Sequence, residues 1–246
     1  MQTVDVELGV LALPDGADRD GADRDDGAHP GAVLIPDVWG LGDHACDLCG
    51  RLAGEGFAVL GVDLYRRLDE VKIEDPGVWI RGLSDPQILS DVEAAAALLA
   101  AHPAVGHRKV GVIGFCMGGT YALLAACGTP GIAAAVPFYG MLSHEHGLLH
   151  DPTGLDRERK PRQPLDAAAE LRCPLLAFFG ADDPYIPLDD VAELERRLEK
   201  VEMASELVVV QGAGHAFMND TRPDAYRPDA AGDAWQRMIG FLRKHL

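Results

Sequence analysis

Three short motifs in the sequence carry the residue types of a nucleophilic catalyst. Cys116 lies in the segment Gly-Phe-Cys-Met-Gly-Gly, which follows an apolar run directly. Asp182 and Asp183 follow a second apolar run, and His215 lies in Gly-Ala-Gly-His-Ala-Phe after a third. A thiol, an imidazole and a carboxylate can act as nucleophile, general base and the acid that orients the base. Their order along the chain is the one in which a common strand–turn–helix design presents these groups.

The setting of Cys116 predicts a sharp turn between a strand and a helix. Gly114 and Gly118 allow close packing around such a strained turn. A helix that begins directly after Cys116 would point its N-terminus at the thiol, where free N–H groups and the helix dipole favour a thiolate. The backbone N–H of Met117 is then the expected donor to an oxyanion. The alternative is a buried Cys116 that acts only as a small apolar side chain, which leaves the glycines unexplained.

The elements that must position these groups follow from the alternation of apolar runs and helical patterns. We expect strands over residues 32–36, 57–62, 110–114, 133–139, 175–180 and 206–210, and helices over 43–55, 86–101, 117–126, 188–201 and 232–245. Near-continuous apolar strands indicate an α/β fold with a mostly parallel sheet and helices on both faces. The carboxyl ends of parallel strands meet at one edge, so the three motifs should converge there. No shift in composition separates two cores, and we expect residues 1–246 to form a single domain.

The segments GFCMGG, GADDPYIP and GAGHAF together resemble the dienelactone hydrolase family of α/β-hydrolases. The resemblance runs from about Ala32 to the C-terminus, and it implies a cysteine-dependent hydrolase of ester or lactone bonds without a cofactor. It implies Cys116 as nucleophile and His215 as general base. The family spacing G-x-x-D favours Asp183 as the acid, with Asp182 as the alternative. The other functions to weigh are a general carboxylesterase or thioesterase, and a non-catalytic protein that binds or senses redox state through a thiol.

A second segment, LIPDVWG, resembles the other loop of the family's site. The resemblance implies that the backbone N–H of Val38 is the second oxyanion donor. Asp37 stands where the family commonly has a Glu that pairs with the thiol and helps to activate it. Because Asp is one methylene shorter, the alternative is that Asp37 caps its own loop.

Aromatic and basic residues near the strand ends are the candidates for substrate binding. Family members that open dienelactones bind the substrate carboxylate with arginines, one of them soon after the catalytic His, where this chain has Asn219. The replacement expected here is Arg81, with Arg66 and Arg67 as further candidates, and ordinary surface charge is the alternative for each. The aromatic candidates for the pocket are Trp39, Tyr65, Trp79, Tyr139 and Phe217.

The composition limits the partners. The 246 residues include 22 basic and 39 acidic ones, which gives a net charge of −17. That charge disfavours nucleic acids and anionic membranes, and it favours a neutral ester or lactone over an anionic one. Five scattered cysteines and a start that lacks a signal-peptide pattern indicate the cytoplasm. We therefore expect a small-molecule substrate, no nucleic-acid or membrane partner, and a monomer or homodimer.

Two segments are expected to be exposed loops. The acidic stretch at about residues 15–28 repeats GADRD, but glycines occupy positions where a calcium loop needs ligands. Residues 144–164 are rich in proline and charge, and they could cover the site as a lid. Neither this stretch nor Cys46-Asp-Leu-Cys49 has the spacing of a metal centre, so we expect no metal.

Overall fold

The structure, a computed structural model, describes residues 2–16 and 28–246. Most of the acidic stretch expected to form a loop at residues 15–28 therefore lies outside the described residues. The strands are β1 (Gln2–Val6), β2 (Gly9–Leu13), β3 (Gly31–Ile35), β4 (Ala58–Val62), β5 (Val110–Phe115), β6 (Ile132–Phe138), β7 (Leu175–Gly180) and β8 (Ser205–Val210). The α-helices are α1 (Asp43–Gly54), α2 (Pro76–Gly82), α3 (Asp85–Ala101), α4 (Met117–Gly128), α5 (Pro164–Ala167), α6 (Leu188–Leu198) and α7 (Pro228–His245), with short 3₁₀ turns at Gly147–Leu149 and Ala168–Glu170.

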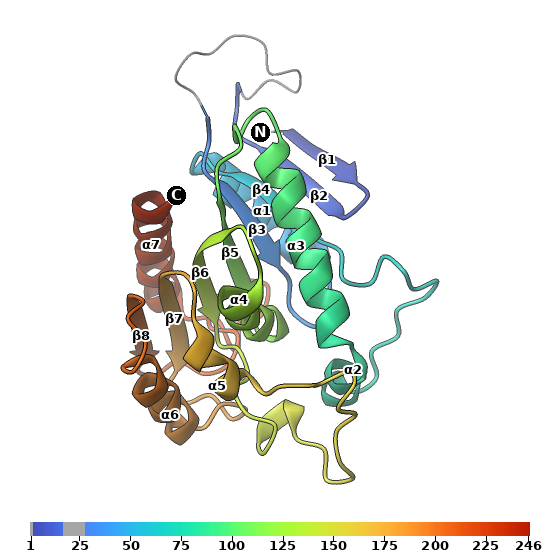
Figure 1. Cartoon of the computed structure of the whole chain (residues 1–246), viewed down its shortest axis with the longest axis vertical. Coiled ribbons are helices and arrows are strands. Elements are labelled where there is room, and N and C mark those ends of the chain that lie inside the picture. Colours follow the sequence, from blue (N-terminus) through green and yellow to red (C-terminus); the bar gives the residue numbers. More distant parts are fainter. Residues whose placement is uncertain (1, 17–27) are drawn as a thin grey trace.

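One sheet of eight strands, in the order β1-β2-β4-β3-β5-β6-β7-β8, forms the centre of the fold. The strands β3 to β8 run parallel to one another, and β1 and β2 form an antiparallel hairpin at one edge. Helices α3 and α4 cover the face of the sheet that is turned to the viewer, and α1 and α7 cover the other face (Figure 1). This is the α/β-hydrolase architecture, and it confirms the predicted fold class.

The parallel part of the sheet contains the elements that the sequence predicts. Strands β3 to β8 and helices α1, α3, α4, α6 and α7 match the expected ranges, with ends that differ by at most four residues. The sequence analysis missed the hairpin β1–β2 and the helix α2. The hairpin mixes polar and apolar residues. Helix α2 is only seven residues long, and Asp75 caps it by accepting a hydrogen bond of 3.0 Å from the Val78 N–H.

Burial is deepest where the chain leads into the site. Every residue of β3, β4, β5 and β7 is buried, whereas β8 forms an exposed edge. Helix α4 is buried on all sides, because its residues from Met117 to Cys127 carry no charge and face both the sheet and the surrounding helices. A fully packed strand and helix therefore hold Cys116 between them, which makes the nucleophile turn a rigid part of the core.

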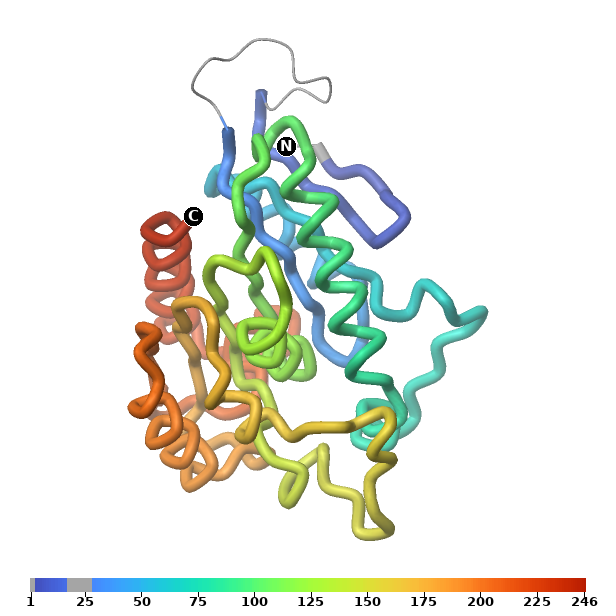
Figure 2. The backbone as a smooth tube through the Cα atoms, viewed as in Figure 1, coloured from blue at the N-terminus to red at the C-terminus, as the bar shows by residue number. Residues whose placement is uncertain are grey.

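The chain from residue 144 to 164 is not simply an exposed loop. It crosses the lower part of the molecule beside α2 and α5 (Figure 2). Lys160, which is 2% exposed, places its Nζ 2.6 Å from Asp85 Oδ1 and 3.0 Å from the hydroxyl of Tyr121. Arg81 of α2 donates a hydrogen bond of 2.9 Å to the Leu148 carbonyl. Most residues of this segment are exposed, and the contacts of Lys160 and Leu148 attach it to α3 and α2. That the segment covers the site as a lid stays a prediction.

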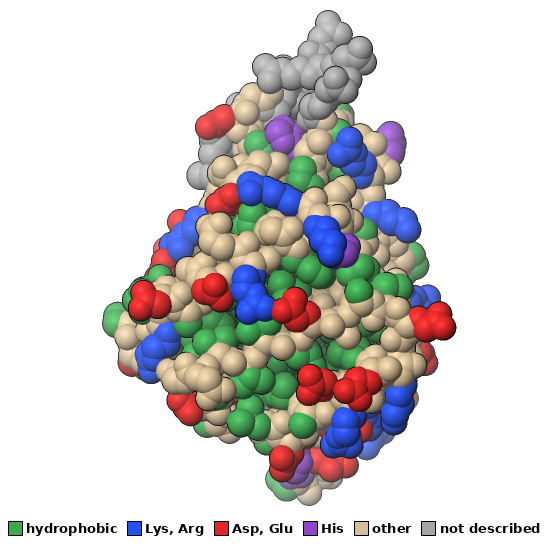
Figure 3. Space-filling view, turned by 90° about the vertical axis from the view of Figure 1, so that its left-hand side faces the viewer, with side chains coloured by type: hydrophobic (Ala, Val, Ile, Leu, Met, Phe, Trp, Pro, Cys, Tyr) green, Lys and Arg blue, Asp and Glu red, His purple; other side chains and the backbone are tan. Residues whose placement is uncertain are grey.

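The surface mixes charges of both signs. On the face drawn in Figure 3, acidic and basic side chains lie interspersed, and hydrophobic side chains gather between them. None of the helices in the described part of the chain is long and apolar enough to cross a membrane.

Candidate active site

Cys116 lies at the turn between β5 and α4, in a backbone conformation that non-glycine residues rarely adopt. Its φ is 55° and its ψ is −117°, and its N–H donates a hydrogen bond of 3.0 Å to the Phe138 carbonyl. Tyr139 and Ala216 also have positive φ, at 38° and 62°. Such strain persists only where the surrounding structure enforces it, and here it concentrates around one thiol and one imidazole.

The glycines around Cys116 are required by close backbone contacts. A Cβ on Gly114 would lie 1.9 Å from the Gly118 carbonyl oxygen, and one on Gly118 would lie 2.1 Å from the Ile35 carbonyl oxygen. A Cβ on Gly119 would lie 2.4 Å from the Phe138 carbonyl oxygen. The second of these contacts brings the loop after β3 against the start of α4. The glycine pattern read from the sequence therefore has a steric cause on three sides of the turn.

His215 and Asp183 form the second part of the site. Asp183 follows β7 and His215 follows β8, and the His215 Nδ1 lies 2.7 Å from Asp183 Oδ2. The other carboxylate oxygen of Asp183 accepts a hydrogen bond of 2.9 Å from the Tyr185 N–H, and its side chain is fully buried. Asp182 instead uses its backbone N–H to bond the Ala213 carbonyl at 2.9 Å. It is thus Asp183, and not its neighbour, whose carboxylate contacts the imidazole.

The electrostatics of His215 link it to Cys116. Burial lowers the pKa of His215, but the charge of Cys116 and the hydrogen bond to Asp183 outweigh burial and raise this pKa to about 10. The Nε2 atom is buried and makes no hydrogen bond of normal geometry to any described residue. The Asp183 carboxylate and the charge of Cys116 therefore favour the protonated, imidazolium form of His215.

Aromatic rings fix the orientation of His215. Tyr139 and Tyr185 both stand edge-on to the imidazole, with centroids at 5.1 Å. Phe217 packs against Tyr139 at 5.5 Å, and both of these side chains are fully buried. Tyr139 therefore lies beside His215, whereas Phe217 packs against Tyr139 in the core. Roles of these two rings in substrate binding stay predictions.

The loop after β3 brings the second expected oxyanion donor to the start of α4. Val38 is buried, and its carbonyl accepts a hydrogen bond of 2.7 Å from the Tyr65 hydroxyl. The same hydroxyl lies 3.9 Å from the Met117 sulfur. The Met117 N–H belongs to the first turn of α4, where N–H groups have no partner within the helix. The Tyr65 hydroxyl thus contacts both residues, Val38 and Met117, whose backbone N–H groups are the expected oxyanion donors.

Asp37 caps its own loop. Its Oδ1 accepts a hydrogen bond of 2.9 Å from the Trp39 N–H, and its carbonyl accepts one of 3.0 Å from Gly40. Burial raises the pKa of Asp37, although the Trp39 hydrogen bond and the nearby His44 and Arg222 partly oppose that rise. Among the described residues, no hydrogen bond joins Asp37 to Cys116. The capping alternative weighed for Asp37 is therefore the contact that the structure contains.

A cavity of about 280 Å³ opens beside Asp37. Its apolar wall comes from the loop after β3, from α1 and from Phe115, and its polar groups include His44, Asn219 and Arg222. Neither Cys116 nor His215 lines it directly. Trp39, at 57% exposed, lines both this cavity and a wider groove of about 640 Å³.

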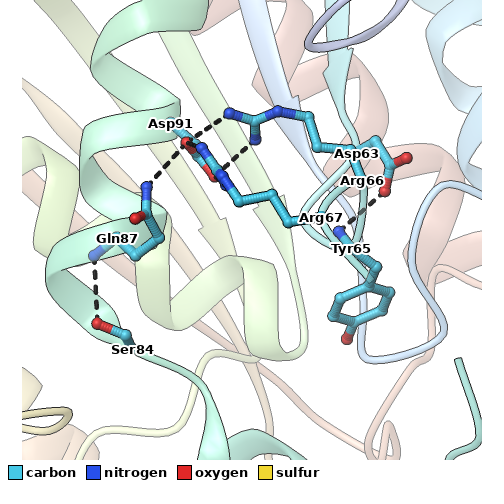
Figure 4. Close-up of polar contacts among 7 residues, drawn as sticks. All are labelled: Asp63, Tyr65, Arg66, Arg67, Ser84, Gln87 and Asp91. Carbon is cyan, nitrogen blue, oxygen red and sulfur yellow. Dashed lines mark hydrogen bonds and ion pairs between the residues drawn. The ribbon is translucent and has the colours of Figure 1, made fainter. Parts of the chain in front are cut away.

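The basic residues expected to bind a substrate carboxylate are engaged elsewhere. Arg66 and Arg67, from the loop after β4, both make paired hydrogen bonds of 2.6–2.8 Å to Asp91 of α3 (Figure 4). Arg81 bonds the Leu148 carbonyl and lies 3.5 Å from Asp151. None of these three arginines lines the cavity beside Asp37, and a role of Arg81 in substrate binding stays a prediction.

The sequence analysis overlooked Arg222 and His44, and it treated Tyr65 only as a pocket aromatic. Arg222 comes seven residues after His215, is exposed, and makes no ion pair with any residue that the structure describes. His44 lies in the first turn of α1, and its Nδ1 is 3.6 Å from Asp220. The family pattern places the carboxylate-binding arginine at the position of Asn219. An arginine three residues further along the chain matches no part of that pattern, so the sequence analysis did not predict a role for it.

Comparisons with known proteins find similar proteins along nearly the whole chain. The family model described as "Dienelactone hydrolase family" matches residues 21–246. A Bradyrhizobium protein, named provisionally as a 2-oxo-3-(5-oxofuran-2-ylidene)propanoate lactonase, is 37% identical over 89% of this chain and 86% of its own. An Escherichia coli K12 protein, named provisionally as a carboxymethylenebutenolidase, is 32% identical over 90% of this chain and 79% of its own.

The fold is also found among solved structures. A Klebsiella pneumoniae protein, described provisionally as a dienelactone hydrolase, superposes with a TM-score of 0.83. It is 29% identical in sequence, and the match covers 99% of this chain and 98% of that one.

Proposed function

Because this chain belongs to the dienelactone hydrolase family and is a hydrolase of ester or lactone bonds, we propose that Cys116 is its nucleophile, with His215 and Asp183 as base and orienting acid. The observation that carries the proposal is the hydrogen bond between the Asp183 carboxylate and the His215 ring, together with the electrostatic interaction between that ring and Cys116, at the ends of the parallel strands β7, β8 and β5. A buried imidazole with one ring nitrogen bonded to a carboxylate keeps the other nitrogen free for proton transfer.

The first half of the reaction uses the charged pair. The Cys116 thiolate attacks the carbonyl carbon, and the carbonyl oxygen gains a negative charge as the tetrahedral intermediate forms. The N–H groups of Val38 and Met117 donate to that oxygen. When the intermediate collapses, the C–O bond breaks and the His215 imidazolium gives its Nε2 proton to the leaving oxygen. A lactone ring opens in this step, and an acyl thioester remains on Cys116.

The second half releases the acyl group. Neutral His215 takes a proton from a water molecule at Nε2, and the resulting hydroxide attacks the thioester carbonyl. The same two N–H groups hold the second oxyanion. Collapse breaks the C–S bond and releases a carboxylic acid, and the thiolate again pairs with the imidazolium. Asp183 holds the Nδ1–H throughout, so the ring keeps one orientation in both steps.

We infer that a substrate carboxylate, where one is present, lies toward Arg222. The Bradyrhizobium relative is named for a lactone that carries a propanoate group. In this chain Arg222 lines the cavity beside Asp37 and is not neutralised by any described carboxylate through an ion pair.

The free thiols of all five cysteines support a reducing compartment such as the cytoplasm, and the small site suits a small-molecule substrate.

The test of the proposal is the loss of hydrolysis in Cys116→Ala. We expect hydrolysis of p-nitrophenyl acetate and of an enol lactone to fall by at least about a thousandfold, because the covalent route is removed. Cys46→Ala is the matched control, since Cys46 is a half-buried thiol whose pKa is raised by burial. Retained hydrolysis in Cys116→Ala would refute the assignment of the nucleophile.

A substrate panel separates a lactonase that binds a substrate carboxylate from a general esterase. Esters and lactones are paired with analogues that carry an added carboxylate, and each pair is measured with the parent protein and with Arg222→Gln. Loss of activity on the carboxylate members alone would support the lactonase proposal. If the parent protein and Arg222→Gln are equally active on each neutral substrate and on its carboxylate analogue, the result would instead support a general esterase.

A further inference from the structure

One peptide unit of the oxyanion loop is held at both of its ends. The carbonyl of Val38 and the N–H of Trp39 belong to the same planar peptide group. The Tyr65 hydroxyl donates to that carbonyl at 2.7 Å, and Asp37 Oδ1 accepts from that N–H at 2.9 Å. A peptide plane with both polar groups bonded cannot rotate without the loss of one hydrogen bond. This peptide unit adjoins the one that carries the Val38 N–H, the expected oxyanion donor, and it restrains how that neighbouring unit can turn.

Tyr65 is itself held firmly. It follows β4, its N–H donates to Asp63 Oδ1 at 2.9 Å, and its side chain is 5% exposed. The ring of Trp79 stands perpendicular to it with centroids 5.5 Å apart. On its other side lies Gly40, whose φ is +79° and whose missing Cβ would lie 2.9 Å from the phenol ring. The ring therefore occupies a space that a side chain at position 40 would close.

The hydroxyl of Tyr65 also reaches the second donor segment. The Met117 sulfur lies 3.9 Å from it, and Met117 is the first residue of α4. Burial raises the pKa of Tyr65 far above its usual value, so the phenol keeps the proton that it donates. One buried donor thus touches both residues whose N–H groups are expected to face the oxyanion.

We propose that Tyr65 is a positioning residue that fixes the oxyanion hole by bonding the Val38 carbonyl beside Met117. The inference rests on the proposed function, because it assumes that Val38 and Met117 hold the oxyanion. Donors that are already oriented stabilise a developing charge more than donors that must reorganise. Tyr65 acts through Val38, and no hydrogen bond joins it to the thiol in the part of the chain that the structure describes. Its effect should therefore appear when the oxyanion forms and not when the thiolate reacts by itself.

The experiment uses Tyr65→Phe, which removes the hydroxyl and keeps the ring. Activity is expressed per active site counted from the burst of p-nitrophenol, so that misfolded protein does not contribute. We expect kcat to fall about tenfold with KM within about twofold, because an oxyanion forms in both halves of the reaction. Affinity for a trifluoromethyl ketone, whose adduct with the thiol carries an oxyanion, should fall by a similar factor. The rate at which iodoacetamide alkylates Cys116 should stay unchanged, because alkylation forms no oxyanion.

Tyr121→Phe is the matched control. Its hydroxyl is also buried and donates a hydrogen bond of 2.9 Å to Asp85, and among the described residues no hydrogen bond joins it to Val38 or Met117. This variant should lose thermal stability without weaker binding of the trifluoromethyl ketone. Unchanged kcat and ketone affinity in Tyr65→Phe would overturn the inference, and so would an equal loss of the alkylation rate. Failure of the proposed function has a different signature, namely activity that survives the alkylation of Cys116.

Discussion

At the scale of single residues, the two acids of the site differ in their partners. Asp183 bonds the imidazole, whereas Asp37 bonds the Trp39 N–H of its own loop. A carboxylate that activates the Cys116 thiol acts through its negative charge. A carboxylate that caps the loop needs only an oxygen that accepts the hydrogen bond from the Trp39 N–H. The two roles of Asp37 can therefore be separated by a substitution that removes only the charge.

Asp37→Asn keeps an oxygen for the Trp39 N–H and removes the negative charge. We expect its kcat to stay within about threefold of the parent value, whereas Asp37→Ala should lose about tenfold, because only Ala frees the peptide unit. Steady-state kinetics with a neutral p-nitrophenyl ester measures both variants. If Asn proves as damaging as Ala, the charge of Asp37 is what the reaction needs.

The pKa of His215 offers a second test at this scale. The charge of Cys116 is the largest contribution that raises this pKa, and the resulting value is about 10. Replacement of Cys116 by Ser removes that charge and leaves Asp183 in place, so the pKa of His215 should fall. An NMR titration of the imidazole C–H signals measures it, and Cys46→Ser should leave the titration unchanged. A pKa that stays near 10 in Cys116→Ser would show that the thiolate does not hold the proton on His215.

At the scale of elements, the loop after β4 depends on α3 for its position. Asp91 of α3 binds the guanidinium groups of both Arg66 and Arg67 (Figure 4). Burial raises the pKa of Asp91, but these hydrogen bonds outweigh burial and lower it to about 2. The cluster thereby holds the loop that carries Tyr65, although its residues do not touch the site.

The depressed pKa of Asp91 sets a pH window for stability. The carboxylate has a lower pKa in the folded protein than in the unfolded chain, where it is about 3.9. Its stabilisation is therefore present above about pH 4 and is lost as the pH falls toward 2. We expect a loss of about 1–2 kcal/mol in the free energy of unfolding across this window, allowing for the exposure of Arg67. Urea titrations should show that the free energy of unfolding falls less across this window in Asp91→Asn than in the parent, and that Glu70→Gln, an exposed control, loses as much as the parent.

The segment at residues 144–164 gives another prediction at this scale. Lys160→Met leaves Asp85 buried without its cationic partner, which typically costs about 3–5 kcal/mol. The free energy of unfolding should fall by that order, and limited proteolysis should cut this segment faster. Lys72→Met, which breaks an exposed pair with Glu70, is the control and should change the free energy of unfolding by less than about 1 kcal/mol. Equal losses in the two variants would mean that Lys160 does not anchor the segment.

The elements were predictable from the sequence to the extent that burial dictates residue type. Cys116 and Asp183 follow strands that are apolar because they are covered on both faces. His215 follows β8, an edge strand that still contains a run of apolar residues, so the shared end of the three strands could be inferred. The sequence does not allow the same inference for the hydrogen-bond partners of Arg66, Arg67 and Arg81. Each partner depends on how a loop passes an element that is distant in sequence. The bond from Tyr65 to Val38 joins residues 27 positions apart, and no local pattern specifies it.

At the scale of the whole molecule, the net charge of −17 acts on any charged substrate before it reaches the site. Basic and acidic side chains mix on the surface in Figure 3, so no single patch attracts anions on that face. Arg222 can act only at close range, because mobile ions screen exposed charges beyond about 8–10 Å at physiological salt.

Salt should therefore affect anionic and neutral substrates differently. For a carboxylate-bearing ester, kcat/KM should rise about two- to threefold between 10 and 200 mM NaCl, because screening weakens the repulsion. For the matching neutral ester, kcat/KM should change little. Stopped-flow or initial-rate measurements at both salt concentrations test this, and a fall in kcat/KM for the anionic ester would show that local attraction exceeds the repulsion by the whole protein.

The three groups of the site come from the ends of β5, β7 and β8, and each reaches the others only after separate stretches of chain have folded back. Parallel strands pair through long crossovers, so these contacts close large loops and form late during folding. Trp39 and Trp79, by contrast, lie in the N-terminal half, and their fluorescence can recover before the C-terminal strands have paired. In a refolding experiment, the return of hydrolysis therefore marks completion of the sheet more strictly than a spectroscopic signal from those tryptophans.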